Sequence, residues 1–181
     1  GFEVGMRFHS APVIRLADAK PMSIGHVIKA DARWHMFVFA DEGALDPVNG
    51  RLAMLCEFLS NDVASPLRRH TPINDDIDSV IDFRAIIQQE FWKVSITDMP
   101  ALLRPRKGPL GLVDYEKVFC PDLKMGQDIF EMRGINRKEG CIIVVRPDQY
   151  VAHVLPLKGH AELASFFDNV LLPCSLDDVS P

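Results

Sequence analysis

The sequence lacks the glycine patterns by which proteins bind nucleotides or expose a catalytic serine. Its 11 glycines never form GxG, GxxxxGK(S/T) or GxSxG. A dinucleotide fingerprint needs closely spaced glycines between a strand and a helix, so that the backbone can approach the pyrophosphate. A serine nucleophile on a sharp turn needs glycines on either side of it. We therefore expect no dinucleotide site, no triphosphate site and no catalytic serine in this chain.

Cysteines and histidines are few, and they are scattered along the chain. No two cysteines form a CxxC pair or have the spacing of a zinc site, and no two histidines have HxH or HExxH spacing. We expect reduced thiols and no metal site. The residues concerned are Cys56, Cys120, Cys141, Cys174, His9, His26, His35, His70, His153 and His160.

The chain also lacks long runs of one charge and long apolar runs. Its net charge of -5 comes from dispersed acidic and basic residues, which gives no surface for tracking phosphates. No apolar run approaches the roughly 18 residues that span a bilayer, and the first ten residues lack the apolar core of a signal peptide. We expect a soluble, cytoplasmic protein that binds neither nucleic acid nor membrane.

What is present is enough apolar sequence, 48% of 181 residues, to build a domain core. Residues 33–40 form a dense β-branched and aromatic run that predicts a buried strand. Asp46 and Pro47 then indicate a helix start, and residues 79–87 predict a second strand, parallel to the first. The helix expected between these two strands has an apolar stripe, which comprises Val48, Leu52, Leu55 and Leu59.

Further elements are expected on both sides of this β-α-β unit. Apolar runs at 11–17 and 26–30 predict short strands near the N-terminus, and the proline-rich residues 99–107 predict an irregular excursion. A short helix at 128–133 should end near Gly134. The remaining expected elements are a hairpin of residues 141–146 and 150–155, and a helix over 160–172 with Leu163, Phe167, Val170 and Leu171 on one face.

This order predicts an α/β protein with a thioredoxin-like fold, in which a central mixed sheet is flanked by helices. We divide the chain into a strand-rich N-terminal extension at 1–33, the thioredoxin-like domain at 34–172 and a C-terminal tail at 173–181. A redox-active thioredoxin needs a thiolate at the start of the first helix, where the helix dipole lowers its pKa. The corresponding residues, 40–46, contain no cysteine.

The alternative hypothesis is a different class of protein, namely an enzyme that uses thiol chemistry. Cys56 lies within the expected helix beside its apolar stripe, where a thiol is usually inert packing, and Cys141 begins an expected strand. A free-standing thioredoxin-fold oxidoreductase or peroxidase would use one of these two thiols. Such an enzyme requires a thiol of low pKa.

Several charged clusters have a simple structural interpretation. Asp75, Asp76 and Asp78 lack the oxygen spacing of a calcium loop, and we interpret them as a solvated turn. The basic clusters 68–70 and 104–107 are interpreted as solvated surface. The alternative for these basic clusters is a docking patch for an acidic neighbour.

Two stretches are distinctive beyond their periodicity. The first is Gly5–Asp18 (GMRFHSAPVIRLAD), followed by Gly25–Trp34 (GHVIKADARW), and the second is Val144–His153 (VVRPDQYVAH). They resemble the third domain of phenol 2-monooxygenases and 3-hydroxybenzoate 4-monooxygenases. Both occur in the family's order, and the likeness spans nearly the whole chain. One departure is Ala32, where the family pattern has glycine, and this suggests a turn of a different type at that point.

The resemblance implies a non-catalytic domain that supports structure and dimerisation. In this family the preceding domains bind FAD and substrate, and the parent protein hydroxylates a phenolic ring with NADPH and molecular oxygen. The resemblance transfers no catalytic, cofactor-binding or metal residue to this chain. It implies a homodimer, with the FAD- and substrate-binding domains as further partners, and it leaves the parent's phenolic substrate open.

The residues that carry the resemblance have structural interpretations. Ser10, Asp18 and Asp31 are expected in turns or backbone caps, and Arg146 with Asp148 at a hairpin corner. An exposed ion pair of this kind contributes only about 0 to 1 kcal/mol. The complete set comprises Arg7, Ser10, Pro12, Arg15, Asp18, Asp31, Arg146, Pro147, Asp148 and Tyr150.

Met54 and Phe58 indicate a possible interface. They lie one turn apart on the expected helix but off its main apolar stripe. A second apolar edge on one helix suggests a second partner surface. The alternative is that the excursion at 99–111 covers both side chains.

Overall fold

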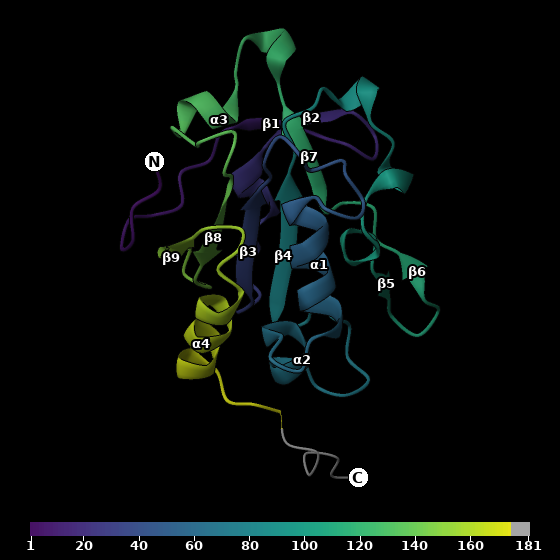
Figure 1. Ribbon diagram of the computed structural model, residues 1–181, viewed down its shortest axis with the longest axis vertical. Coiled ribbons are helices and arrows are strands. Elements are labelled where there is room, and N and C mark those ends of the chain that lie inside the picture. Colours follow the sequence, from purple (N-terminus) through teal and green to yellow (C-terminus); the bar gives the residue numbers. More distant parts are fainter. Residues whose placement is uncertain (175–181) are drawn as a thin grey trace.

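The computed structural model describes residues 1–174, and its centre is a seven-stranded sheet with the strand order β2-β1-β7-β4-β3-β8-β9 (Figure 1). The pairs β3–β4 and β4–β7 are parallel and the other neighbours are antiparallel, so the sheet is mixed. The tail expected at 173–181 lies outside the described residues from residue 175 onward. The strands of this sheet are β1 Pro12–Arg15, β2 Lys20–Ser23, β3 Trp34–Phe39, β4 Ile81–Ile86, β7 Val118–Pro121, β8 Cys141–Val145 and β9 Val151–Leu155.

The helices lie on both faces of the sheet, and a separate hairpin of β5 and β6 stands to one side (Figure 1). The hairpin strands are β5 Arg106–Lys107 and β6 Leu112–Val113. The α-helices are α1 Arg51–Asn61, α2 Pro66–His70, α3 Ile129–Met132 and α4 His160–Val170. The 3-10 helices are η1 Ile24–Val27, η2 Phe91–Lys93, η3 Ile96–Asp98, η4 Ala101–Leu103 and η5 Leu123–Met125.

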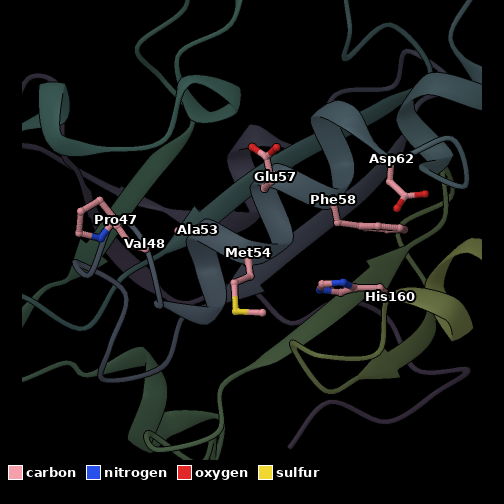
Figure 2. A pocket seen from close by; sticks show the side chains of 8 residues that line it. All are labelled: Pro47, Val48, Ala53, Met54, Glu57, Phe58, Asp62 and His160. Carbon is pink, nitrogen blue, oxygen red and sulfur yellow. The ribbon is translucent and has the colours of Figure 1, made fainter.

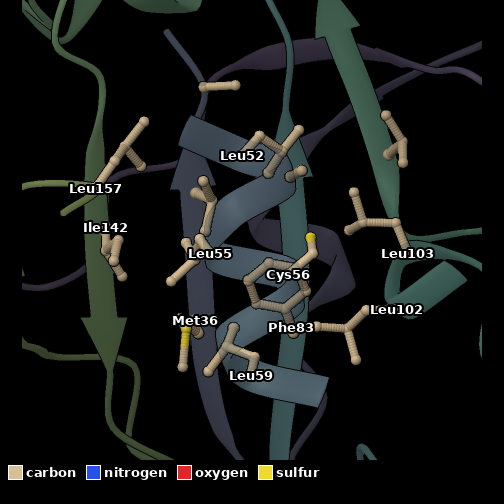
Figure 3. Close-up of a cluster of buried hydrophobic side chains, with 14 of the residues drawn as sticks. Met36, Leu52, Leu55, Cys56, Leu59, Phe83, Leu102, Leu103, Ile142 and Leu157 are labelled. Carbon is tan, nitrogen blue, oxygen red and sulfur yellow. The ribbon is translucent and has the colours of Figure 1, made fainter. Parts of the chain in front are cut away.

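The helix α1 packs against one face of the central strands, as the β-α-β interpretation predicts (Figure 3). β3 and β4 run parallel in a six-residue register from Trp34–Ile81 to Phe39–Ile86. Leu52, Leu55 and Leu59 are completely buried. Burying a leucine side chain stabilises the fold by about 1.5 to 3 kcal/mol, so this stripe fixes the helix on the sheet.

The opposite face is covered by the N-terminal residues and by α3. Phe8 stacks on Phe37 with the ring centroids 4.6 Å apart, and Phe130 meets Phe39 edge to face at 5.5 Å. The N-terminal chain also follows the outer edge of β9, where the Gly5 amide donates to the Val151 carbonyl at 2.8 Å. This segment therefore covers an edge of the sheet that would otherwise expose unpaired backbone groups.

The start of α1 differs from the prediction. The Asp46 carboxylate accepts hydrogen bonds from the Val48 and Asn49 amides, both at 2.9 Å, and so closes a turn before the helix. The N-cap is Gly50, in an extended conformation. Val48 is 74% exposed and does not belong to the buried stripe. The helix thus begins four residues beyond Pro47, because the Asp46 side chain caps a turn instead of the helix.

Other differences concern short or exposed elements. The run at 26–30 is not a strand, because η1 occupies Ile24–Val27. α2 is a short helix that the sequence did not predict, and it is capped by Ser65 and begins at Pro66. Val170 is 45% exposed, so it is not on the buried face of α4, whereas Leu163 and Phe167 are buried.

β7 is an element that the sequence did not predict. It is only four residues long and ends in a proline, which is a weak strand signal. Its place between β1 and β4 depends on pairing with both neighbours. The expected short helix is confirmed as α3, with Asp128 as its cap, and the expected hairpin is confirmed as β8 and β9.

Candidate functional site

The loop between β3 and α1 is the position at which a redox thioredoxin carries its thiol. Here the loop holds Asp41 and Asp46, and Arg51 at the start of the helix approaches the Asp41 carboxylate at 3.8 Å. A Cβ atom added at Gly50 would lie 2.4 Å from the Asp46 carbonyl oxygen, so this loop closes tightly on its own backbone. Acidic side chains and inward-facing carbonyls do not suit a pyrophosphate, and the loop does not fit a flavin or nicotinamide dinucleotide.

None of the cysteines lies in that loop: Cys56 and Cys120 are buried, and Cys141 is partly buried and pairs with Phe39 at the end of β3. Burial raises the pKa of the Cys56 thiol far above its usual range, and it raises the pKa values of Cys120 and Cys141 to about 12. A protonated thiol is a poor nucleophile. These thiols therefore act as packing groups at neutral pH, contrary to what a thiol oxidoreductase or peroxidase would need.

A cluster of buried charges lies where β4 and β7 approach each other. The Lys117 ammonium, which is 1% exposed, contacts Asp78 closely and the Asp82 carboxylate at 2.6 Å. Asp82 also accepts from Arg84 Nε at 2.7 Å and lies 3.3 Å from His35 Nδ1. The interpretation of Asp78 as part of a solvated turn is therefore wrong, because Asp78 is 3% exposed and paired with cations.

The electrostatics of this cluster favour ionised carboxylates. Burial pushes the pKa of Asp82 upward, but the hydrogen bond to His35 and the charges of Arg84 and Lys117 outweigh it and hold the pKa well below its usual range. The same competition between burial and Lys117 lowers the pKa of Asp78. Within residues 1–174, no group of histidine, cysteine or acidic side chains has the arrangement of a metal site. The cluster therefore consists of buried, paired and ionised side chains.

Both basic clusters were expected to be solvated, and each is partly tied to the body of the domain. Lys107 donates to Asp78 at 2.9 Å, whereas Arg106 remains exposed and makes no ion pair within the described residues. In the other cluster, Arg69 pairs with Asp168 at 2.5 Å and His70 is buried. The solvated interpretation is thus wrong for Lys107 and His70.

A shallow groove runs along α1 beside the start of α4 (Figure 2). Met54 is 48% exposed, and Phe58 stacks on the His160 ring at 4.6 Å with an interplanar angle of 13°. The groove has a volume of about 580 Å³. No residue of the excursion at 99–111 lines it, so that excursion does not cover Met54. The groove-lining residues are Pro47, Val48, Ala53, Met54, Glu57, Phe58, Asp62 and His160.

The residues of the two resembling stretches lie in turns and strand pairs. The Ser10 hydroxyl accepts from the Gly25 amide at 2.9 Å, and Asp31 accepts from the Arg33 amide at 3.2 Å. Ala32, between Asp31 and Arg33, has a φ of 64°, which is the left-handed conformation that favours glycine. The turn at Asp31 thus keeps a glycine-like conformation despite the alanine.

The remaining residues that carry the resemblance lie in or beside the outer strands, at the two ends of the sheet. Asp18 binds Arg15 at 2.6 Å, which lowers the pKa of Asp18 to about 2. Arg7 donates to the Gln149 side chain at 2.8 Å. The other positions are Pro12 in β1, the exposed ion pair of Arg146 and Asp148 with Pro147 in the turn between them, and Tyr150, whose backbone bridges to Arg7.

Sequence reasoning missed the buried cation Lys117 and its partner Asp82. One signal was present in β4, where Asp82 and Arg84 alternate with apolar residues in an otherwise buried strand. Such alternation places two opposite charges on one face of a strand. Lys117 itself gave no signal, because its burial depends on a strand 35 residues away.

The sheet order, the flanking helices and the loop without cysteine define a thioredoxin-like domain that lacks the redox thiol. Solved structures support the fold alone. A putative protein disulfide isomerase from Bacteroides thetaiotaomicron is 10% identical, with a TM-score of 0.52, over 93% of this chain and 88% of that one. A peroxiredoxin-like protein from Aquifex aeolicus is also 10% identical, with a TM-score of 0.50, over 94% of this chain and 88% of that one.

The chain belongs to the family described as "Phenol hydroxylase, C-terminal dimerisation domain", which it matches over residues 1–175. It is 57% identical to a 3-hydroxybenzoate 4-monooxygenase from Comamonas testosteroni, over 94% of this chain and 27% of that protein. It is 30% identical to a FAD-dependent monooxygenase from Aspergillus terreus, over 93% of this chain and 28% of that protein. The chain thus spans about a quarter of the length of these relatives. Among the helices described here, none is long and apolar enough to cross a membrane.

Proposed function

We propose that this chain is the non-catalytic dimerisation domain of a larger flavin-dependent phenol hydroxylase. The family match over residues 1–175 carries the proposal. The geometry agrees with it, because the loop at the redox position has carboxylates where a thiol would be needed, and the buried thiols have raised pKa values. In this function the domain supplies a rigid body and a contact surface, and no group of the domain reacts.

For the parent protein we propose hydroxylation of a phenolic ring with FAD, NADPH and molecular oxygen. The proposal rests on two relatives, which are named as a 3-hydroxybenzoate 4-monooxygenase and a FAD-dependent monooxygenase. The flavin would be bound by domains that precede this one, since the loop at 40–50 does not suit a dinucleotide. A cytoplasmic location belongs to the same proposal, because four unpaired cysteines are typical of a reducing compartment.

The domain would contact those preceding domains near α3. Gly1 lies beside the end of that helix (Figure 1), because a Cβ atom added at Gly134 would lie 3.7 Å from the backbone nitrogen of Gly1. Val4 and Met6 in the same segment are 63% and 45% exposed. Exposed apolar residues beside the point at which the preceding chain arrives favour contact with it.

Sedimentation equilibrium of the 181-residue chain and of the parent hydroxylase tests this function. We expect the parent to be a dimer, the chain to self-associate, and the parent truncated before residue 1 to retain FAD while losing the dimer. A monomeric parent, or a truncated parent that remains a dimer, would contradict the proposal. Rapid labelling of Cys56 or Cys141 below neutral pH, without denaturant, would contradict the non-catalytic assignment.

A further inference from the structure

The hairpin of β5 and β6 exposes apolar side chains at its tip. Its turn places Gly108 and Gly111 at φ values of 66° and 60°, and between them Leu110 is 83% exposed. Leu112, at the start of β6, is 67% exposed. Two exposed leucines on one projecting hairpin are unusual for a surface that faces only water.

This hairpin is held firmly along its first strand, β5, and at the start of its turn. Lys107 binds Asp78 at 2.9 Å and Asp114 at 3.6 Å. The Gly108 amide donates to the Asp76 carboxylate at 2.7 Å. An anchored loop loses little conformational freedom when a partner binds, which favours association.

The groove along α1 is the apolar surface that suits this tip. Val48 and Met54 are 74% and 48% exposed, and the stacked rings of Phe58 and His160 lie beside them (Figure 2). Glu57 and Asp62 are exposed at the groove, and neither carboxylate forms an ion pair within the described residues. The groove therefore offers apolar contact together with negative charge.

The hairpin has the complementary charge. Arg106 is exposed, its guanidinium donates to the Gly111 carbonyl at 3.0 Å, and it makes no ion pair with a carboxylate in the described part of the chain. A cation beside two exposed leucines matches two carboxylates beside an apolar groove, both in charge and in the kind of surface.

A hairpin does not occupy the groove of its own chain. The groove lies between α1 and α4, whereas the hairpin projects beyond the other side of α1 (Figure 1). No residue between 99 and 115 lines the groove. The occupant must therefore come from another chain or from another part of a longer chain.

We propose that the hairpin tip, Leu110 and Leu112 with Arg106, inserts into the groove of a second copy of this chain beside Met54, Glu57 and Asp62. In a closed two-fold dimer the contact forms twice, with the tip of each copy in the groove of the other. The inference rests on the proposed dimerisation function and adds the surfaces that carry it. A tip that docks on the preceding flavin-binding domains is the competing outcome.

Cross-linking between two differently tagged copies of the parent hydroxylase tests the contact. One copy carries Leu110→Cys, the other carries Met54→Cys, and both carry Cys174→Ser. A short thiol–thiol cross-linker is expected to join the two tags. The matched control replaces Met54→Cys with Met125→Cys, which is 72% exposed in η5, and no joined product is expected from it.

Charge exchange provides an independent readout. Arg106→Glu is expected to weaken self-association at least tenfold in sedimentation equilibrium, and Glu57→Arg in the same chain is expected to restore it. Leu110→Asp is expected to weaken association by at least tenfold, whereas Met125→Asp leaves it unchanged. All four side chains are exposed, so circular dichroism should show an unchanged fold.

The outcomes separate this inference from the function on which it rests. A wild-type parent that sediments as a monomer would overturn the dimerisation function and the inference together. A parent that remains a dimer with Leu110→Asp and yields no joined product would overturn the inference alone. A Leu110 cross-link within one chain, to the flavin-binding domains, would likewise overturn it in favour of the competing contact.

Discussion

The interior around Lys117 and the surface around Leu110 both depart from the usual distribution of residues, in opposite directions. Lys117 is a charged residue that is 1% exposed, while Leu110 is an apolar residue that is 83% exposed. The buried ammonium has three carboxylates within 3.4 Å, but the exposed leucine has no comparable cover from residues 1–174. The difference suggests that the first region serves the fold and that the second serves association.

The buried cluster also explains why the hairpin is firmly placed. Asp78 binds Lys117 inside the domain and Lys107 in strand β5 of the hairpin. One carboxylate therefore joins the core to the projecting element. Removing a partner from the buried cluster should lower the stability of the domain, whereas changes at the hairpin tip should alter association alone.

Lys117→Met should produce the largest effect. The substitution leaves Asp78 and Asp82 with less compensation in a buried place, and breaking a buried pair from one side costs about 3 to 5 kcal/mol. Urea unfolding at pH 7 measures the change. Lys29→Met, at an exposed position, is the control and should change the free energy of unfolding by less than about 0.5 kcal/mol. Equal stability of the two variants would mean that the cluster does not support the fold.

Leu55 and its neighbour Met54 provide a second, smaller contrast. Leu55 is completely buried and Met54 is 48% exposed on the same helix. Leu55→Ala should lower the free energy of unfolding by about 2 to 5 kcal/mol, because it removes buried contacts and leaves a cavity. Met54→Ala should change it by less than about 0.5 kcal/mol when measured in a monomeric background such as Leu110→Asp. A large loss from Met54→Ala would show that Met54 is part of the fold.

Acid should destabilise the buried cluster. The pKa values of Asp78 and Asp82 are lowered in the folded state from a usual value of 3.8. Below about pH 4 the unfolded state therefore binds more protons than the folded state, and stability falls as the pH falls. The slope is at most about 1.4 kcal/mol per pH unit for each proton.

Urea unfolding at pH 7, pH 5 and pH 3 measures this dependence. A small loss is expected between pH 7 and pH 5, because burial lowers the pKa of His160 and the unfolded state therefore binds more protons. A larger loss is expected by pH 3, as Asp78 and Asp82 are protonated. Lys117→Met should show a shallower acid slope than the wild type, because Asp82 has lost one of the cations that lower its pKa. An identical slope in the variant would exclude Lys117 as a source of the lowered pKa.

Ala32→Gly should give the smallest effect, and it should be stabilising. Ala32 has a φ of 64°, a conformation that costs a residue with a Cβ atom roughly 1 kcal/mol. Glycine removes that cost but adds freedom to the unfolded chain, so the net gain should be under about 1 kcal/mol. Thermal unfolding measures it. A destabilised Ala32→Gly variant would mean that the alanine methyl group makes a compensating contact.

The sequence was most informative where a short stretch decides the result by itself. The run at 33–40 contains enough β-branched and aromatic residues to form a strand in almost any context, and it became β3. The spacing of Leu52, Leu55 and Leu59 defines an apolar stripe without reference to any partner. The absence of cysteine at 40–46 was likewise visible directly, and with it the absence of a redox thiol.

Only the tertiary structure decided the features that depend on residues far apart in the sequence. β7 is a strand because β1 and β4 pair with it on both sides. Asp78 and Lys117 are buried because they meet across 39 residues of sequence, and a buried charge is tolerated only where its partners converge. The tertiary structure also decided that Leu110 and Met54 are exposed. The sequence shows that these side chains are apolar, but it does not show which apolar side chains the folded chain leaves uncovered.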